Sequence, residues 1–191
     1  PAEFFEFSYR DSALKRGLKG VIGWVEFKLY KLGGLSVPMA SGQITNHVGA
    51  EYGSQLPLKQ VRDTVIELRS SKGMVISEAD PNSRSCGSFF TNPVVSSIKA
   101  LEFPDEMQKW KMEDGESVKL SAGWLIENAG IPKGYSIPGS KAAISQKHAL
   151  AITNTGGASA ADVVELARFI QERVSSRWGM NLIPEPNLIG F

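Results

Sequence analysis

The stretch Ser159-Ala-Ala-Asp-Val-Val-Glu-Leu-Ala-Arg-Phe-Ile-Gln-Glu-Arg-Val-Ser-Ser-Arg177 carries the strongest structural pattern of the chain. Ser159 stands three residues before Asp162, the spacing of a capping box at the start of a helix. Five apolar residues then recur at helical spacing and form one stripe: Val163, Leu166, Ala167, Ile170 and Val174. Acidic residues come early and arginines late, as the helix dipole favours. The stretch therefore predicts a structural helix whose apolar stripe packs on a sheet.

The chain before this helix mixes strand and helix patterns in irregular order. β-Branched and aromatic residues predict a strand over residues 21–30. Pro57 suits the first turn of a helix in which Val61, Val65 and Leu68 share one face. Three further segments predict a strand, a strand end with a helix, and a short buried strand: residues 94–103, 118–128 and 149–153. The irregular order predicts an α+β fold rather than a repeating βαβ array.

Two segments lack such periodicity. Residues 31–56 are rich in Gly, Ser and Pro and are expected to form a long mobile loop near a site. Residues 73–87 contain turn chemistry, which is expected to deliver Ser88 from a loop. Residues 1–10 have no initiator methionine and open on aromatic alternation, as a strand cut from a larger sheet would. We therefore expect a truncated or processed chain.

Composition excludes several classes of partner. The 191 residues include 21 Lys and Arg against 20 Asp and Glu, so no large field would attract nucleic acid or a membrane surface. An anionic ligand would have to be held by local donors. The single cysteine, Cys86, excludes an internal disulfide and fits a reducing compartment. No apolar run has the length of a membrane span, so we expect a cytoplasmic protein without nucleic-acid or membrane partners.

The stretch Gly87-Ser-Phe-Phe-Thr-Asn-Pro93 is the strongest candidate for chemistry. Ser88 could be a nucleophile, but His47 and His148 lie in unrelated contexts and Phe90 stands where a nucleophile elbow has its second glycine. Acyl transfer is therefore disfavoured. A hydroxyl can instead give a proton to a carbanion or enolate whose charge is stabilised nearby. A serine that only caps a tight turn remains the equal alternative.

Two further candidates are a cation and a carboxylate. Arg10 could clamp a carboxylate or polarise an enolate, although an ion pair with Asp11 or another acid is the more common role of such an arginine. Glu185 is held between two prolines of fixed φ, which either aims its carboxyl group or only stiffens the end of the chain. A general acid here would need burial to raise its pKa, which the apolar neighbours Leu182, Ile183 and Leu188 could provide.

Basic residues that could bind a phosphate-bearing ligand are scattered along the chain, where they could equally form a solvated surface: Lys72, Lys119, Lys133 and His148. Two histidines and one cysteine without ligand spacing predict no metal site. The glycines at 17–23 and 156–157 lack the spacing of a nucleotide-binding motif. A site for a nucleotide cofactor is therefore not visible in the sequence.

Five separated motifs together resemble the UDP-N-acetylenolpyruvoylglucosamine reductase family. In chain order the first two are Tyr9-Arg-Asp-Ser12 and Gly87-Ser-Phe-Phe-Thr-Asn-Pro93. The third is Val118-Lys-Leu-Ser-Ala-Gly-Trp-Leu-Ile-Glu127, and the fourth is Lys147-His-Ala-Leu150 with Asn154. The last is Leu182-Ile-Pro-Glu-Pro-Asn-Leu-Ile-Gly190. They span nearly the whole chain, so chance agreement is very improbable.

The resemblance implies an oxidoreductase of peptidoglycan synthesis. In that family NADPH reduces FAD, and the flavin passes hydride to UDP-N-acetylglucosamine enolpyruvate, which gives UDP-N-acetylmuramate. The positions matching Ser88, Arg10 and Glu185 are catalytic: the serine donates the proton, and the other two assist. Seven positions match substrate contacts: Tyr52, Lys72, Asn92, Trp110, Lys119, Lys133 and His148. Trp110 departs from the family's frequent tyrosine, so a hydroxyl contact would become an indole N–H contact or be lost.

The resemblance also implies a domain plan. Residues 1–70 would end an FAD-binding α+β domain, residues 71–180 would form a mixed α+β substrate-binding domain, and residues 181–191 would return to the flavin domain. The main flavin-binding segment would precede this chain, so the isolated chain is expected to be inactive. Two alternatives remain: a UDP-sugar binding module without catalysis, and a related flavin oxidase, which would lack the combination of the serine and Pro-Glu-Pro motifs.

Overall fold

The structure is a computed structural model, and it describes residues 1–190. The chain divides into two compact units, Pro1–Arg62 and Asp63–Phe191. Helices and short antiparallel sheets both occur, which confirms the predicted α+β class. The candidate residues lie in both units, so each unit is described by itself.

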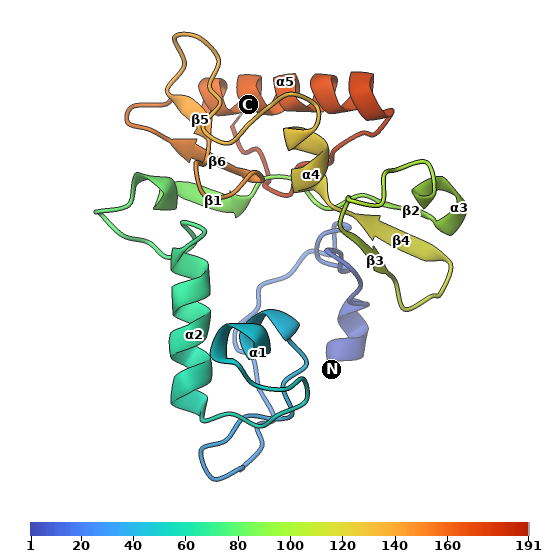
Figure 1. Cartoon of the computed structure of the whole chain (residues 1–191), viewed down its shortest axis with the longest axis vertical. Helices are drawn as coiled ribbons and strands as arrows, with labels where there is room; N and C mark the ends of the chain where they lie inside the picture. Colours follow the sequence, from blue (N-terminus) through green and yellow to red (C-terminus); the bar gives the residue numbers. More distant parts are fainter. Residues whose placement is uncertain (191) are drawn as a thin grey trace. The chain divides into compact units, whose positions relative to one another are not determined.

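The second unit contains two three-stranded antiparallel sheets (Figure 1). In the first, β6 (Ala151–Asn154) lies between β1 (Ser85–Ser88) and β5 (Ala142–Ile144). In the second, β4 (Ser117–Leu120) lies between β2 (Val94–Ser96) and β3 (Lys109–Lys111). The predicted strand at 149–153 and strand end at 118–128 are thus confirmed. The expected strand over residues 94–103 is only partly correct, because it ends at Ser96 and α3 (Ser97–Ala100) follows.

The longest helix, α5 (Ala160–Trp178), lies across the β1–β6–β5 sheet and contacts β5 and β6 (Figure 1). Ser159 and Asp162 form both bonds of the predicted capping box, and Gly179 ends the helix with φ of 63°. Four members of the predicted stripe are buried: Leu166, Ala167, Ile170 and Val174. The local pattern alone therefore specified this helix correctly.

A single apolar cluster joins the elements of the second unit. It includes residues of α5, of the helix α4 (Ala122–Glu127), of β5 and β6 in one sheet and of β4 in the other, and the pair Phe89 and Phe90. Leu125 and Ile126 of α4 are fully covered, and α4 contacts α5. Burial of this cluster is the main stabilising contribution to the unit. The two sheets are consequently held by one core, and side chains at their edges have fixed positions.

The first unit contains little regular structure of its own. It comprises the 3₁₀ turn η1 (Ala2–Phe5), helix α1 (Gly42–Val48) and the start of α2 (Leu58–Ser70). The helix predicted after Pro57 is confirmed by α2. The strand-like opening predicted for residues 1–10 is wrong, since η1 begins there and a lone bridge joins Ser8 to Asp11.

Two other expectations for this unit fail for identifiable reasons. Residues 21–30 form no strand, because within the described chain no segment pairs with them, and Val21, Trp24 and Phe27 lie exposed. Residues 31–56 do not form an uninterrupted loop, because α1 occurs within them. Gly49, with φ of 68°, closes α1 in the left-handed conformation that glycine adopts readily.

Candidate functional site

Ser88 is the last residue of β1 and is half-buried. It pairs with Ala151 of β6, and the register between the strands shifts between Ser85 and Ser88. Gly87 has φ of 83°, a conformation that a residue with a Cβ adopts only with strain. The preceding turn, η2 (Pro81–Ser83), is the turn chemistry expected from the sequence. Ser88 thus sits at the end of an irregular strand rather than in a loop.

The segment that carries Glu185 pairs with the residues that follow Ser88. The backbone N–H of Glu185 donates to the carbonyl of Phe89 at 2.8 Å, and the N–H of Thr91 donates to the carbonyl of Ile183 at 3.0 Å. A bridge also joins Phe90 to Pro184. The structure therefore brings together the backbones of the serine and Pro-Glu-Pro motifs, which lie far apart in sequence.

The surroundings of Glu185 differ from those expected of a deeply buried acid. The residue itself is half-buried. Leu182 belongs to the core at 1% exposure, but Ile183 and Leu188 are 66% and 52% exposed. Of the three apolar neighbours expected to cover the carboxyl group, only Leu182 is therefore itself buried.

Arg10 and Tyr52 belong to the first unit. Arg10 has φ of 56° in the turn between Ser8 and Asp11, and its carbonyl accepts a hydrogen bond from Lys15 Nζ at 3.1 Å. The carboxylate of Asp11 accepts a hydrogen bond from Arg16, which lowers the pKa of that carboxyl. Tyr52 is 72% exposed.

A second group comprises Lys72, Lys133 and His148. It is here called the anion cluster, because its basic side chains could bind an anionic ligand. Lys72 follows the end of α2, and His148 lies in the turn between β5 and β6. Burial lowers the pKa of His148, and the charges of Lys72 and Lys133 lower it further. Lys133 Nζ also lies 3.8 Å from Glu127 Oε1. The sequence predicted these three residues separately, and the structure brings them within electrostatic reach of one another.

The hydrogen bonding of His148 defines which nitrogen it offers to a ligand. The backbone N–H of Leu150 donates to His148 Nδ1 at 3.2 Å. Nδ1 must then be the unprotonated nitrogen, so the neutral ring carries its proton on Nε2. A neutral imidazole still offers an N–H donor to an anion. It adds no third positive charge that would repel the two neighbouring ammonium groups.

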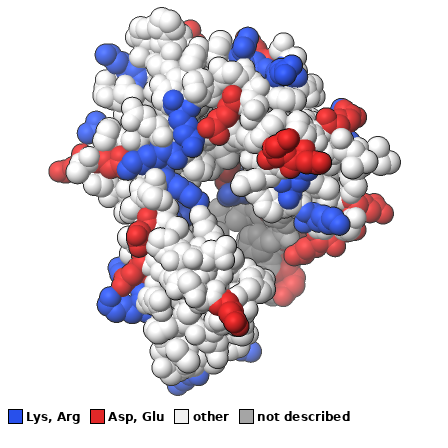
Figure 2. Space-filling view, in the orientation of Figure 1, with Lys and Arg blue, Asp and Glu red and all other residues white. Residues whose placement is uncertain are grey.

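Figure 2 shows Lys and Arg side chains gathered over the region where Figure 1 draws β1, β6 and the end of α2. The remainder of this face carries both signs of charge. A net charge of +1 for the whole chain therefore conceals a local concentration of positive charge.

The remaining predicted ligand contacts lie on or beside the β2–β4–β3 sheet. Trp110 of β3 is directly opposite Lys119 of β4, and the Lys119 ammonium is 5.5 Å from the indole centroid. That spacing is within the range of a cation–π contact. Asn92 Oδ1 accepts from the backbone N–H of Ala122 at 2.9 Å, so its carbonyl oxygen helps to start α4. Lys119 and Trp110 thus form a pair, while part of Asn92 has a structural role.

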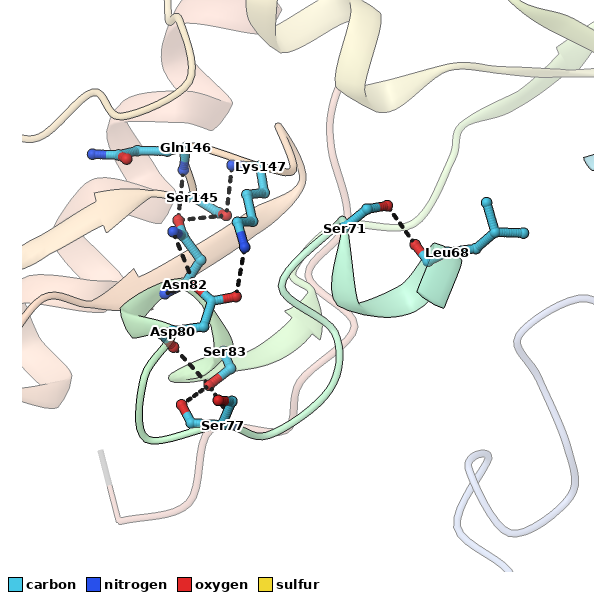
Figure 3. A network of polar contacts seen from close by, with 9 residues as sticks. All are labelled: Leu68, Ser71, Ser77, Asp80, Asn82, Ser83, Ser145, Gln146 and Lys147. Atoms are coloured by element: carbon cyan, nitrogen blue, oxygen red, sulfur yellow. Dashed lines mark hydrogen bonds and ion pairs between the residues drawn. The ribbon is translucent and has the colours of Figure 1, made fainter. Parts of the chain in front are cut away.

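The sequence reasoning missed a polar network that joins the turn at residues 80–83 to residues 145–147, just before His148 in sequence (Figure 3). Asn82 Oδ1 accepts hydrogen bonds from Ser145 Oγ at 3.0 Å and from the backbone N–H of Gln146 at 2.8 Å. Lys147 Nζ lies 2.8 Å from Asp80 Oδ2. The only signal in the sequence was the turn Asp80-Pro-Asn-Ser83, which predicted local turn bonds but gave no sign of a partner more than sixty residues away.

Residues 1–190 contain neither a group of metal ligands nor a membrane-spanning helix. No group of three or more His, Cys, Asp or Glu side chains in this part of the chain could hold a metal ion. No helix among the same residues is both long and apolar enough to cross a membrane. Cys86 is a free, exposed thiol.

Comparison with known proteins identifies the family. Residues 80–189 match the family model described as UDP-N-acetylenolpyruvoylglucosamine reductase, C-terminal domain. The chain is 42% identical to the UDP-N-acetylenolpyruvoylglucosamine reductase of Leifsonia xyli, over 96% of this chain and 57% of the relative. It is 44% identical to that of Mycobacterium sp. strain MCS, over 96% of this chain and 53% of the relative.

A solved structure, the UDP-N-acetylenolpyruvylglucosamine reductase (MurB) of Thermus caldophilus, is 27% identical with a TM-score of 0.38. That match covers 70% of this chain and 36% of the other. The chain spans about half the length of the curated relatives it matches. The family match covers the serine motif, the anion cluster except Lys72, and the Pro-Glu-Pro motif, so the resemblance found in the sequence is confirmed. The chain belongs to the UDP-N-acetylenolpyruvoylglucosamine reductase family and contains its C-terminal domain.

Proposed function

We propose that this chain supplies the substrate-binding and proton-donating part of a reductase that converts UDP-N-acetylglucosamine enolpyruvate to UDP-N-acetylmuramate. The hydride would come from NADPH through FAD, as the family resemblance implies. The observation that carries the proposal is the pairing of the two most distinctive motifs within the family-matched region, where the N–H of Glu185 donates to the carbonyl of Phe89 at 2.8 Å.

In the proposed reaction Ser88 is the proton donor. Addition of hydride to the enolpyruvyl double bond leaves an electron pair on the carbon beside the carboxylate, as an enolate. The Ser88 O–H bond breaks, a C–H bond forms at that carbon, and the serine oxygen recovers a proton from solvent or from a neighbouring acid. Arg10 and Glu185 are proposed to stabilise the enolate or to assist this transfer, since a cation and a hydrogen-bonding carboxyl group lower the energy of developing negative charge.

The anion cluster is the proposed binding site for the diphosphate. Two ammonium groups and a neutral Nε2–H donor can supply charge-assisted hydrogen bonds to phosphate oxygens. Lys119 and Trp110 are proposed to hold another part of the nucleotide sugar, with Asn92 and Tyr52 as further contacts. The half-exposed state of Trp110, at 41%, leaves its ring accessible to a ligand.

The two glycines before the longest described helix do not form a site for an FAD pyrophosphate. The long helix preceded by two glycines is α5, but its first turn is bonded by Ser159 and by the carboxylate of Asp162, which would repel phosphate. The N–H of Gly156 is also engaged, since it donates to Asn154 Oδ1 at 2.9 Å. We therefore derive no step through the flavin from these residues, and we propose that its site lies in the part of the relatives that this chain does not match. Catalysis by the isolated chain is not expected.

Calorimetry with the enolpyruvyl UDP-sugar, and with UDP alone for comparison, tests the proposed binding. Lys119→Ala should weaken binding, because a hydrogen bond to a charged group contributes about 1.5–3 kcal/mol, which is about 10- to 150-fold in affinity. Lys111→Ala is the matched control, because Lys111 lies on neighbouring β3 and has no proposed ligand. Equal losses in the two variants would reject a specific site and indicate only a general effect of charge.

The complete protein, with the segment that its relatives possess, tests the catalytic role. Ser88→Ala should leave the reduction of bound flavin by NADPH intact and abolish the reduction of the UDP-sugar. Full turnover in this variant would remove Ser88 from the mechanism. If the complete protein lacked flavin absorbance yet bound the UDP-sugar, the chain would instead be a binding module without catalysis.

A further inference from the structure

The hairpin turn that carries His148 is fixed through Ser145. The Ser145 side chain is fully buried, its hydroxyl donates to Asn82, and its oxygen accepts the backbone N–H of Lys147 at 3.1 Å. The backbone N–H of Ser145 also donates to the carbonyl of Ala151 across the hairpin at 2.8 Å. Movement of Asn82 would therefore release a turn that ends at His148.

Asn82 makes an equally close contact with the connection that begins at Lys72. The next residue, Gly73, has φ of 68°, and a Cβ added there would lie 2.9 Å from Asn82 Cβ and 3.1 Å from its carbonyl oxygen. Contacts under about 3 Å are not tolerated by real side chains, so the close approach requires glycine. Asn82 thus touches the chain one residue from Lys72 on one side and bonds to the His148 turn on the other.

The side-chain amide of Asn82 suits this position because it can both accept and donate hydrogen bonds. Its oxygen accepts from Ser145 and Gln146, and its Nδ2 lies 3.3 Å from Asp80 Oδ1, which also accepts the backbone N–H of Asn82 at 3.1 Å. The other oxygen of Asp80 binds Lys147. Figure 3 shows the side chains of Asp80 and Asn82 directed toward those of Ser145 and Lys147. An apolar side chain of similar size could make none of the three bonds of the side-chain amide, which join it to Ser145, Gln146 and Asp80.

We propose that Asn82 is a positioning residue that sets the spacing between Lys72 and His148, so that the two side chains receive one anionic group of the phosphate class. The ligand class rests on the function proposed above, whereas the spacing rests on the contacts of Asn82 alone. Lys147, the neighbour of His148 in sequence, belongs to the same network, because its ammonium lies 2.8 Å from Asp80 Oδ2.

Asn82→Ala tests the spacing through the titration of His148. The chain has only two histidines, so their ring signals can be followed by NMR, with His47 as an internal reference. The pKa of His148 is now lowered by burial and by Lys72 and Lys133. Loss of Asn82 should let the turn move into solvent and away from Lys72, and the pKa should rise toward 6.5, the ordinary value.

Binding of UDP is the second measurement. We expect Asn82→Ala to bind UDP about tenfold more weakly, the change that corresponds to about 1.4 kcal/mol. Ser145→Ala removes one hydroxyl from the same contact. It should raise the pKa of His148 and weaken the binding of UDP, each by less than Asn82→Ala does. Asn128→Ala is the matched control, because Asn128 Nδ2 donates only to Trp124 in its own helix at 2.9 Å, and it should change neither.

An unchanged pKa of His148 and an unchanged affinity for UDP in folded Asn82→Ala would overturn the proposal. If circular dichroism shows that Asn82→Ala is unfolded, Ser145→Ala becomes the test. An unchanged titration of His148 in Ser145→Ala would then overturn the proposal. If the parent chain itself does not bind UDP, the ligand class fails together with the proposed function. The titration then still decides whether Asn82 sets the spacing, so the two failures are distinguishable.

Discussion

Truncation of Leu182 should destabilise the second unit and loosen the segment that carries Glu185. Leu182 is 1% exposed, and its carbonyl accepts a hydrogen bond from Gln171 Nε2 of α5 at 2.7 Å. Leu182→Ala removes three methyl or methylene groups, each of which contributes about 0.8 kcal/mol when buried. With the cavity left behind, the loss of unfolding free energy should be about 3 kcal/mol, within the usual range of about 2–5 kcal/mol for such changes.

Ile183→Ala is the matched control for Leu182→Ala. Ile183 is the next residue in the chain and also precedes Pro184, but it is 66% exposed. Its truncation should change the free energy of unfolding by no more than about 0.5 kcal/mol. Urea unfolding followed by tryptophan fluorescence measures both variants, and at about 2–4 °C per kcal/mol the melting temperature of Leu182→Ala should fall by roughly 6–12 °C.

The same pair of variants tests the connection between the core and the site. The N–H of Glu185 donates to the carbonyl of Phe89, and this bond should protect it from exchange. Leu182→Ala should raise its hydrogen-exchange rate relative to the parent, and Ile183→Ala should not, because an opening of the segment costs less free energy once its anchor is removed. Equal stability of the two variants, within about 1 kcal/mol, would refute the reasoning that burial of Leu182 holds this segment in place.

Three further predictions concern local features. Ser159→Ala should lower the free energy of unfolding by about 1 kcal/mol, measured in urea, because it removes the capping oxygen that accepts the N–H of Asp162. Residues 19–31 should exchange their amide hydrogens at rates close to those of an unfolded chain, since no backbone hydrogen bond protects them within the described structure. The hydrogen bond from Lys147 lowers the pKa of Asp80 below its ordinary 3.8, so its contribution to stability is present above pH 3.8 and lost as the pH falls through the lowered value. Lys147→Met should therefore make acid unfolding less steep in that range, and an unchanged acid titration curve would contradict this assignment.

The sequence predicted those elements whose signals are local. The capping box and apolar stripe of α5 lie within the helix itself, and Pro57 marks the start of α2 in the same way. Helix α1 was missed because its N-cap, Ser41, makes no side-chain cap bond, and Thr45 and Asn46 are weak helix formers. Strand β5 was missed because it is only three residues long and consists of Ala142, Ala143 and Ile144, all buried without alternation.

Residues 21–30 show the opposite error, a strong pattern without the structure it favours. β-Branched and aromatic residues stabilise a strand through neighbours on an adjacent strand, so the preference is conditional on a partner. None of the described segments supplies one, and the apolar side chains remain exposed. A pattern of this kind therefore predicts which contacts a segment can make, but not that they are made.

Prediction of the candidate site required two kinds of information: which residues match the ligand contacts of the family, and which segments the fold brings together. Resemblance identified Lys72, Lys133 and His148 one by one, but the charge of Lys72 reaches His148 only because the fold brings the exit of α2 to the β5–β6 turn. Asn82 makes that contact, and its role was hidden because asparagine in a turn usually bonds to its own backbone. The residues around Asn82 in the sequence do not show that its side chain bonds to a segment far along the chain.

The position of Ser88 follows from the two phenylalanines after it. Consecutive residues of an extended segment point to opposite faces, yet Phe89 and Phe90 are 3% and 1% exposed. The segment must therefore be covered on both faces. The N–H of Phe89 donates to Leu150 beside β6, and its carbonyl accepts from Glu185 on the other side. Because β6 and the C-terminal segment both hold Phe89, a half-buried Ser88 lies where the strand leaves the core, and any change that moves either neighbour should move the serine as well.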